Sequence, residues 1–368
     1  LNSNDAFATG SRQLLYAAAG CAGLLFLSAT DYRRWRVLAT PFLVLSLVML
    51  VLVMIPGIPT DGGLRRSLDL GPVSIHAAEV AKLALVVFLA AQLSQRGHAL
   101  ADVRGTILPL ILAIATAVCL VLVEPDLGTA GVLGLIGLSI LFSAGIALRW
   151  VLAIGVAGAL AAIVGIALNE YQSARLGGWM DPFVDPLGSS YQTLQGLMAM
   201  ALGGPIGTGI GSSQQPGGIV VPYSWNDYIY AVVGQEFGIA GAVLVILAFL
   251  LIAIRGLRIA DRAPDTFGAL IAVGITTWIC GQAFINIGVV LAILPVTGVP
   301  LPFVSQGGSS LIVLLAAIGL LLSVSRETMG ESEQGGTDAR FDRGRWNRGA
   351  PVPRVRYRSF APSSPYQR

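Results

Sequence analysis

Residues 37–55 read VLATPFLVLSLVMLVLVMI, a run without a charged residue that is apolar on every face from Leu43 to Ile55. A helix needs about 20 predominantly apolar residues to cross the hydrocarbon core of a bilayer. A transmembrane β-strand instead alternates apolar and polar residues over roughly 10 positions, and this run does not alternate. The stretch therefore predicts a membrane-spanning helix.

The rest of the chain repeats this pattern. Of the 368 residues, 55% are hydrophobic and only 12% are charged, whereas an ordinary soluble domain has about 25% charged residues. We predict an all-α, polytopic helical membrane protein with about nine transmembrane helices in one domain over residues 1–326. The other apolar runs lie at about 14–30, 80–95, 107–123, 129–147, 150–168, 229–254, 267–293 and 309–324.

Arginine residues gather in alternate connections between the predicted spans. Short cytoplasmic loops keep Lys and Arg, so these connections are expected on the cytoplasmic side. With nine spans and a cytoplasmic C-terminus, the N-terminus falls outside, which leads us to expect a further upstream span. No cleavable signal peptide is visible in the first residues. The predicted extracytoplasmic segments lie at about 56–78, 124–128, 169–228 and 294–308, and 169–228 is the longest.

The C-terminal segment differs in composition from the spans. After Arg326 the chain is rich in Gly, Ser, Pro and Arg, which predicts a disordered basic cytoplasmic tail over 327–368. Such a tail either stays solvated or binds anionic lipid head groups. Cys21, Cys119 and Cys280 lie in apolar spans and are expected to be inert core residues. We expect no disulfide framework, no metal cluster and no nucleic-acid partner.

Charged residues beside the spans are a strong functional signal, because a charge in hydrocarbon is costly and is usually paired or functional. Glu79 and Lys82 lie three residues apart at the start of a predicted helix and project from one face. They either form a structural ion pair or face an outward-open cavity that holds a polar ligand. In the turn at 124–129, Asp126 suits the N-cap of the next helix, which leaves the second carboxylate, Glu124, unexplained.

The predicted extracytoplasmic segments contain further charged candidates. Arg65, Arg66 and Arg175 lie there against the usual arginine bias. Their guanidinium groups suit either phospholipid head groups or a substrate pyrophosphate. Asp227 stands beside aromatic residues where the next span begins, and its position alone fits either a helix cap or a catalytic group.

The segment 169–228 also has local structure of its own. Residues Tyr191–Leu202 predict a short amphipathic helix, and a glycine-rich run follows at 203–211. No strand precedes this run, so it is not a dinucleotide-binding fingerprint. Its glycines either let backbones pack closely or present N–H groups to an anion.

The run from Ile293 to Ser310, ILPVTGVPLPFVSQGGSS, resembles the signature of the SEDS family (shape, elongation, division and sporulation), which includes FtsW, RodA and SpoVE. Other matches follow in the family's order from Arg12 to Arg326, which is nearly the whole chain. Family members usually have ten spans, which agrees with an expected span upstream. The matches include Arg12-Gln13, Glu79 with Lys82, the 124–129 turn, Arg175, Tyr191-Gln192 with Gln195, Gly207, Gly209, Gly211, Asp227, Glu236 with Gly238, and Gln282 with Asn286.

The resemblance implies a peptidoglycan glycosyltransferase that polymerises lipid II into β-1,4 glycan strands on the outer face of the bacterial cytoplasmic membrane, for cell division or cell shape. Asp227 matches the family's essential aspartate and is expected to assist deprotonation of the acceptor 4-hydroxyl. The basic candidates suit the leaving pyrophosphate, and the acidic ones shape the cavity. The expected substrate-binding residues are Arg65, Glu79, Lys82, Asp126, Arg175, Gln192, Gln195, Ser305 and Ser309.

The resemblance also implies partners. Lipid II, a class B penicillin-binding transpeptidase and membrane lipids are expected. No cofactor is required by the sequence, and a divalent cation, Mg²⁺ or Mn²⁺, is an option for neutralising the phosphates. Two other functions use the same residues: a lipid II flippase or transporter, and a non-catalytic scaffold for the transpeptidase.

Four positions depart from the family's pattern. The family commonly has Trp at the position of Arg66, Gln at that of His76, Lys at that of Gln215 and an aromatic residue at that of Gln306. All four lie in the predicted extracytoplasmic segments, so altered substrate handling is one interpretation. The presence of Asp227 argues against an inactive enzyme.

Overall fold

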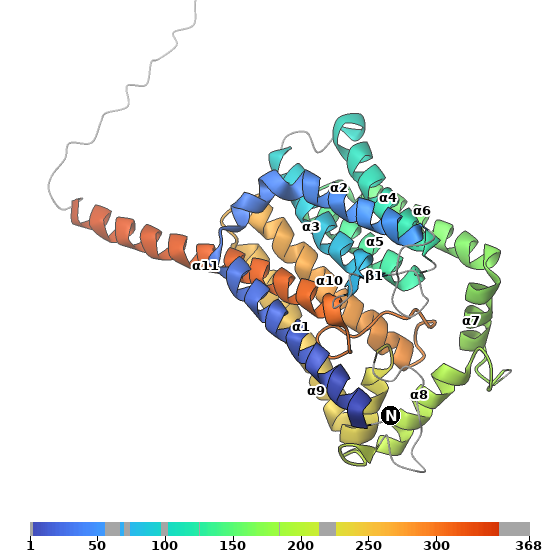
Figure 1. The fold of residues 1–368 in the computed structure, drawn as a ribbon. Helices are drawn as coiled ribbons and strands as arrows, with labels where there is room; N and C mark the ends of the chain where they lie inside the picture. The colour runs from blue at the N-terminus through green and yellow to red at the C-terminus, as the bar shows by residue number, and fades with distance from the viewer. Residues whose placement is uncertain are drawn as a thin grey trace, which may run out of the picture. The chain divides into compact units, whose positions relative to one another are not determined.

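The computed structural model describes residues 3–55, 67–69, 74–96, 102–124, 126–183, 185–212 and 226–345, and their side chains except those of 3–9, 69, 171 and 329–345. Most of this part is helical (Figure 1). Within it, eight helices are long and apolar enough to cross a membrane, and a shorter apolar helix spans Leu127–Ser143. The prediction of an all-α, polytopic membrane protein is confirmed.

Each of the nine predicted runs falls on one apolar helix. A 3-10 turn, η1 (Tyr32–Arg34), precedes the second of them, and a π-helical turn, η3 (Val103–Ile107), precedes the fourth. Two short strands, β1 (Ser67–Asp69) and β2 (Ser74–His76), pair antiparallel before the third helix and were not predicted. The apolar helices are α1 (Ser3–Ala29), α2 (Trp35–Met54), α3 (Ala77–Gln95), α4 (Leu108–Val123), α5 (Leu127–Ser143), α6 (Leu148–Leu168), α9 (Ile229–Arg262), α10 (Thr266–Val290) and α11 (Gly308–Arg345).

Helices α3 and α10 form the centre of the bundle. In an 18-residue stretch of each, 78% and 67% of the residues are buried, against 6% in α6. Helix α10 packs against α9, α5 and α3, as Figure 1 shows. Its buried residues include Trp278, Gln282 and Asn286. Polar side chains lie on this central helix because protein groups, rather than lipid tails, surround them.

Peripheral helices expose apolar side chains. Helix α6 has one buried residue, Val151, and most of its other large aliphatic side chains are exposed. The expectation that all three cysteines are core residues is wrong for Cys21 and Cys119, which are exposed, and correct for Cys280. In a membrane protein, lipid accepts apolar side chains as readily as the core does, so apolar character does not indicate burial.

The long segment between α6 and α9 contains two helices, α7 (Glu170–Met180) and α8 (Tyr191–Gly203), and α8 confirms the helix predicted there. The indole Nε1 of Trp179 donates a hydrogen bond to the carbonyl of Ala292, 2.8 Å away. The Ser190 hydroxyl donates to the carbonyl of Gly178 at 3.0 Å. These bonds fix α7 against the segment that follows α10 and against the start of α8.

The glycine-rich run after α8 fills a break in α9. The backbone of Gly238 is non-helical, with φ 68° and ψ −164°. The carbonyl of Gly204 accepts from the N–H of Ile239 at 2.9 Å, and the N–H of Thr208 donates to the carbonyl of Gln235 at 2.9 Å. The glycines therefore serve close backbone packing, the first of the two predicted roles.

Gly207→Ala tests this packing. A Cβ at Gly207 would overlap the carbonyl of Glu236, and the φ of 92° disfavours any side chain. We expect a loss of about 1–3 kcal/mol in the free energy of unfolding, measured on the detergent-solubilised protein. Gly131→Ala in α5 is the control, because open space surrounds it. Equal stability of the two variants would contradict the close packing.

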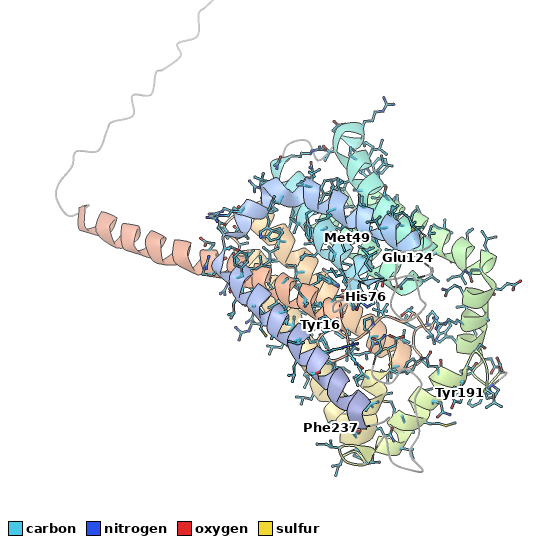
Figure 2. The ribbon with its side chains drawn as sticks, viewed as in Figure 1. Tyr16, Met49, His76, Glu124, Tyr191 and Phe237 are labelled. Atoms are coloured by element: carbon cyan, nitrogen blue, oxygen red, sulfur yellow. The ribbon has the colours of Figure 1, made fainter. Side chains whose placement is uncertain are left out.

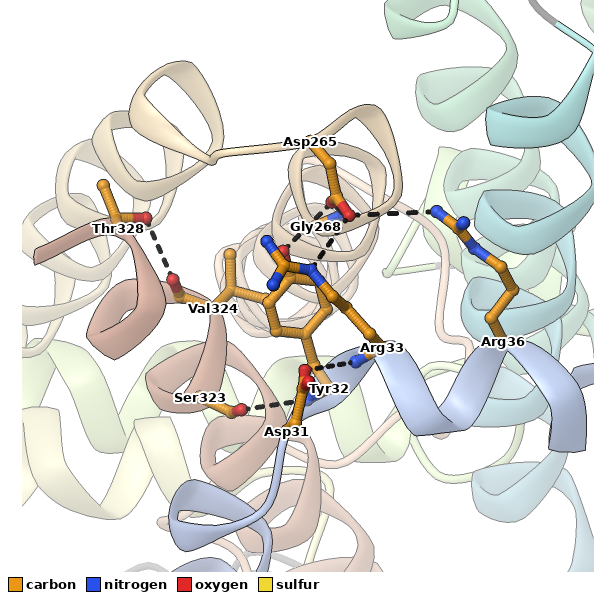
Figure 3. Close-up of polar contacts among 9 residues, drawn as sticks. All are labelled: Asp31, Tyr32, Arg33, Arg36, Asp265, Gly268, Ser323, Val324 and Thr328. Atoms are coloured by element: carbon orange, nitrogen blue, oxygen red, sulfur yellow. Dashed lines mark hydrogen bonds and ion pairs between the residues drawn. The ribbon is translucent and has the colours of Figure 1, made fainter. Parts of the chain in front are cut away.

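The arginine-rich end of the bundle is held by Asp265 (Figure 3). Its Oδ1 accepts from the Tyr32 hydroxyl at 3.0 Å and from the N–H of Gly268 at 2.7 Å, which caps α10. Its Oδ2 lies 3.4 Å from Arg33 Nε and 3.8 Å from a terminal nitrogen of Arg36. One carboxylate thus joins the α1–α2 connection to the α9–α10 connection.

The chain divides into two units, Leu1–Thr328 and Met329–Arg368. Helix α11 continues as helix to Arg345. Residues 327–345 thus differ from the disordered tail predicted from residue 327. No proline occurs between Arg326 and Ala350, although Gly330, Gly335 and Gly336 lower the helix propensity of this stretch. Residues 346–368 lie outside the described residues.

Candidate active site

A cavity of about 140 Å³ lies where several predicted extracytoplasmic segments meet. These segments are the end of β2 with the start of α3, the α4–α5 turn, the residues before α9 and the residues before α11. Figure 2 labels His76 and Glu124 among them. The lining residues are His76, Ala78, Glu79, Glu124, Asp126, Thr129, Asn226, Gly298, Pro300, Gln306, Gly307 and Ser310.

The lining is acidic. Glu79, Glu124 and Asp126 contribute three carboxylates, each 6–8% exposed, and none of the described lining residues is Lys or Arg. Carboxylates of this kind repel phosphate groups and stabilise positive charge. The cavity therefore suits a sugar centre that becomes positive during reaction better than it suits a pyrophosphate.

Lys82 lies behind this lining. Its ammonium is fully buried, 2.5 Å from Glu79 Oε1 and 2.7 Å from Gln282 Oε1. It also lies 5.2 Å from the centre of the Trp278 ring. Lys82 thus forms the predicted structural ion pair, while Glu79 both pairs with Lys82 and lines the cavity. Lys82 does not line the cavity, because a buried ammonium needs protein partners on every side.

Asp126 has two roles: it caps a helix and it lines the cavity. Its Oδ1 accepts from the N–H of Thr129 at 3.0 Å, and its Oδ2 accepts from the Thr129 hydroxyl at 2.9 Å. It is therefore the N-cap of α5, as its spacing predicted, and it also lines the cavity. Glu124, the second carboxylate of this turn, is not needed as a helix cap, and it lines the same cavity.

Asp227 is half-buried beside this cavity. Its neighbour Asn226 is a lining residue, and a Cβ placed on the lining residue Gly298 would lie 3.5 Å from Asp227 Oδ2. Helix α9 begins at Ile229, and its N-cap position is Tyr228, whose side chain makes no capping hydrogen bond. Asp227 therefore lies one residue before the N-cap position, and its role stays a prediction.

Arg175 lies on α7, and its guanidinium affects the same tyrosine as Asp227 does. Burial raises the pKa of Tyr228 to about 12, Thr193 and the Arg175 guanidinium oppose this shift, and the Asp227 carboxylate adds to it. The guanidinium and the carboxylate therefore both act on one phenol. Arg175 is thus a positive charge near Tyr228, the residue that follows Asp227, whereas the described cavity lining has no Lys or Arg.

The remaining predicted residues have varied positions. Gln192 and Gln195 are half-buried on α8, outside the cavity lining. The Ser309 hydroxyl accepts from the N–H of His76 at 2.9 Å, and the Ser305 hydroxyl donates to the carbonyl of Asn226 at 2.7 Å. These serines hold backbone in place. Arg65 lies outside the described residues, as do Arg66 and Gln215.

Several lining residues were not predicted as site residues. Glu124 had a signal in the sequence, namely a second carboxylate in a short turn. His76 and Gln306, two of the positions that depart from the family's pattern, also line the cavity. The departure itself was the signal for these two. Asn226 and Thr129 gave no signal apart from their neighbours Asp227 and Asp126.

Among the described residues, His, Cys, Asp and Glu side chains form no group of three or more that is arranged to hold a metal ion. The Mg²⁺ or Mn²⁺ ion considered from the sequence stays a prediction.

Comparisons with known proteins agree on one family. The family model for FtsW, RodA and SpoVE, described as "Cell cycle protein", matches residues 1–330. Stage V sporulation protein E of Bacillus subtilis (strain 168) is 38% identical over 325 residues, which is 88% of each chain. A probable peptidoglycan glycosyltransferase FtsW of Geobacter metallireducens is 36% identical over 329 residues, covering 89% of this chain and 87% of the relative.

Solved structures share the fold. A chain of a peptidoglycan synthase complex, studied for its structural coordination of polymerization and crosslinking, superposes with a TM-score of 0.73 at 30% identity, covering 87% of this chain and 90% of that one. The rod shape determining protein RodA of Thermus thermophilus gives a TM-score of 0.64 at 28% identity, covering 86% and 87%. The present chain is a multi-pass membrane protein that belongs to the FtsW/RodA/SpoVE family of cell cycle proteins.

Proposed function

We propose that this protein is a peptidoglycan glycosyltransferase that polymerises lipid II into β-1,4 glycan strands. The observation that carries the proposal is the position of Asp227, whose carboxylate lies beside the lining residue Gly298 at the edge of an acidic cavity. The names of the FtsW relatives support the same activity. The proposed location is the outer face of the bacterial cytoplasmic membrane, as the arginine distribution predicts.

In the proposed reaction, Asp227 accepts the proton of the acceptor's 4-hydroxyl as that oxygen attacks the anomeric carbon of the donor. A carboxylate within hydrogen-bond reach of the hydroxyl suits general-base catalysis. The bond from the anomeric carbon to the pyrophosphate oxygen breaks, and undecaprenyl pyrophosphate leaves with the bonding electrons. Displacement at an α-linked donor inverts the configuration and gives a β-1,4 linkage.

Charge determines where each part of the donor lies. The sugar ring becomes positive in the transition state, which suits the side of the cavity lined by Glu79, Glu124 and Asp126. The pyrophosphate becomes more negative and is repelled by those carboxylates. Arg175, which acts with Asp227 on Tyr228, is the described cation placed to stabilise it.

A class B penicillin-binding transpeptidase is the proposed protein partner. The chain shares its fold with a component of a peptidoglycan synthase complex in which polymerization and crosslinking are coordinated. Such a partner would crosslink the peptides of the strands that this protein makes.

The test is polymerisation by the purified full chain. Fluorescent lipid II is incubated with the protein in detergent, with and without a candidate transpeptidase, and products are separated on a gel. We expect a ladder of glycan chains that a muramidase specific for β-1,4 linkages digests. Unchanged lipid II from folded protein, even with the transpeptidase present, would overturn the proposed function.

A further inference from the structure

The two residues that precede Tyr228, the N-cap residue of α9, are held by buried side chains from elsewhere in the fold. The amide Nδ2 of Asn286, on α10, donates to the carbonyl of Asp227 at 2.7 Å and to the carbonyl of Val299 at 2.8 Å. The Ser305 hydroxyl donates to the carbonyl of Asn226 at 2.7 Å and accepts from the N–H of Leu301 at 2.7 Å. Two consecutive carbonyls are therefore each tied to the segment 299–301.

These ties determine the position of the Asp227 carboxylate. Gly298, beside which Asp227 Oδ2 lies, immediately precedes Val299, one of the two residues that Asn286 binds. The same amide thus fixes the backbone that carries the carboxylate and the backbone next to the residue beside which the carboxylate lies. Asn286 is only 1% exposed and belongs to the central helix, so its own position is fixed by packing.

Hydrogen bonding to two buried carbonyls does not by itself explain why residue 286 is an asparagine. The Oδ1 of Asn286 is buried and has no hydrogen-bond partner among the described residues. A buried acceptor without a donor is costly, so an asparagine here is retained in spite of that cost. Both of its N–H groups are used, and the planar amide holds the two carbonyls at a fixed separation.

We propose that Asn286 is a positioning residue that holds Asp227 in the geometry needed to accept the proton of the acceptor hydroxyl. The inference rests on the proposed function. Asn286 does not line the cavity, so it acts through Asp227 rather than on the substrate. A displacement of about 1 Å in a catalytic group is enough to slow a reaction about 10²-fold.

The first arm of the test measures initial rates of lipid II polymerisation by Asn286→Leu. We expect kcat to fall about 10- to 10²-fold while KM for lipid II changes less than about 3-fold, because binding groups are unaffected. Asn286→Gln, which keeps an amide but lengthens it, is expected to fall between wild type and Asn286→Leu and is measured in case the leucine variant does not fold. Thr276→Val is the control, since it removes another buried polar group of α10 about 15 Å along the helix.

The second arm repeats the substitution in an Asp227→Glu background. The longer side chain already displaces the carboxylate, so Asn286→Leu is expected to cost less than about 3-fold more there. An Asn286→Leu rate equal to that of wild type, or the same fold loss in both backgrounds, would overturn the positioning role. Both outcomes leave the proposed function intact. Absence of polymer from wild-type protein would instead overturn the proposed function, and the inference with it.

Discussion

Asp227→Asn is expected to lower the rate of lipid II polymerisation about 10²–10⁴-fold, the range that general-base catalysis contributes. The substitution keeps the size and planarity of the side chain. It also keeps the backbone carbonyl that Asn286 binds and the position beside Gly298. An amide does not accept a proton at neutral pH, so the variant loses the base while retaining the geometry. The measurement is the initial rate on fluorescent lipid II.

Asp181→Asn is the matched control for this experiment. Asp181 is an exposed residue of the same long segment, and its Oδ1 accepts from the N–H of Phe183 at 3.1 Å, a role that an amide oxygen fills equally well. We expect its rate to equal that of wild type. The comparison separates loss of the base from loss of one negative charge in the segment between α6 and α9.

Asp227→Asn also separates the three functions that the sequence left open, namely glycosyltransferase, transporter and scaffold. A transporter would continue to move labelled lipid II across a liposome membrane when it carries Asp227→Asn. A scaffold carrying Asp227→Asn would still support growth of cells that depend on this protein. Retention of polymerisation by purified Asp227→Asn would contradict the catalytic role assigned to Asp227. Loss of polymerisation with a normal thermal unfolding midpoint is the expected result.

Much of the fold follows from the sequence because the bilayer imposes a simple requirement. Each span must satisfy its backbone internally, so apolar runs such as 37–55 indicate helices directly. The arginine distribution grouped the segments that contain His76, Asp126 and Gln306, and the structure brings these three residues to one cavity. Arginine-rich and arginine-poor connections alternate along the chain, and this alternation alone grouped segments that meet in the fold.

The direction in which individual side chains point did not follow from the sequence. Lys82 and Glu79 share a helix face, but only the packing of α10 shows that the ammonium points inward and the carboxylate lines the cavity. The hydroxyls of Ser305 and Ser309 bond to backbone groups of residues 226 and 76, and the prediction that these serines bind substrate stays a prediction. Such contacts join residues far apart in the chain, so no local pattern encodes them.

Lys82→Met is expected to destabilise the folded protein by about 3–5 kcal/mol, the usual cost of removing one partner from a buried ion pair. The substitution keeps the length of the side chain and removes its charge. It leaves the Glu79 carboxylate, which is 6% exposed and pairs with Lys82 through Oε1 at 2.5 Å, without its cation. Gln282 also loses the donor that its Oε1 accepts at 2.7 Å. The measurement is the free energy of unfolding in mixed micelles.

Two further variants test whether the unpaired, buried Glu79 carboxylate causes the loss of stability in Lys82→Met. Glu79→Gln combined with Lys82→Met removes both charges, and it should recover a large part of the lost stability because no unpaired carboxylate remains. Arg326→Met breaks the ion pair with Glu327, whose side chains are 48% and 31% exposed, and should cost about 0–1 kcal/mol. If Lys82→Met were as stable as Arg326→Met, Glu79 would not need Lys82 to remain charged. The acidic cavity would then be maintained by solvent rather than by the ion pair beneath it.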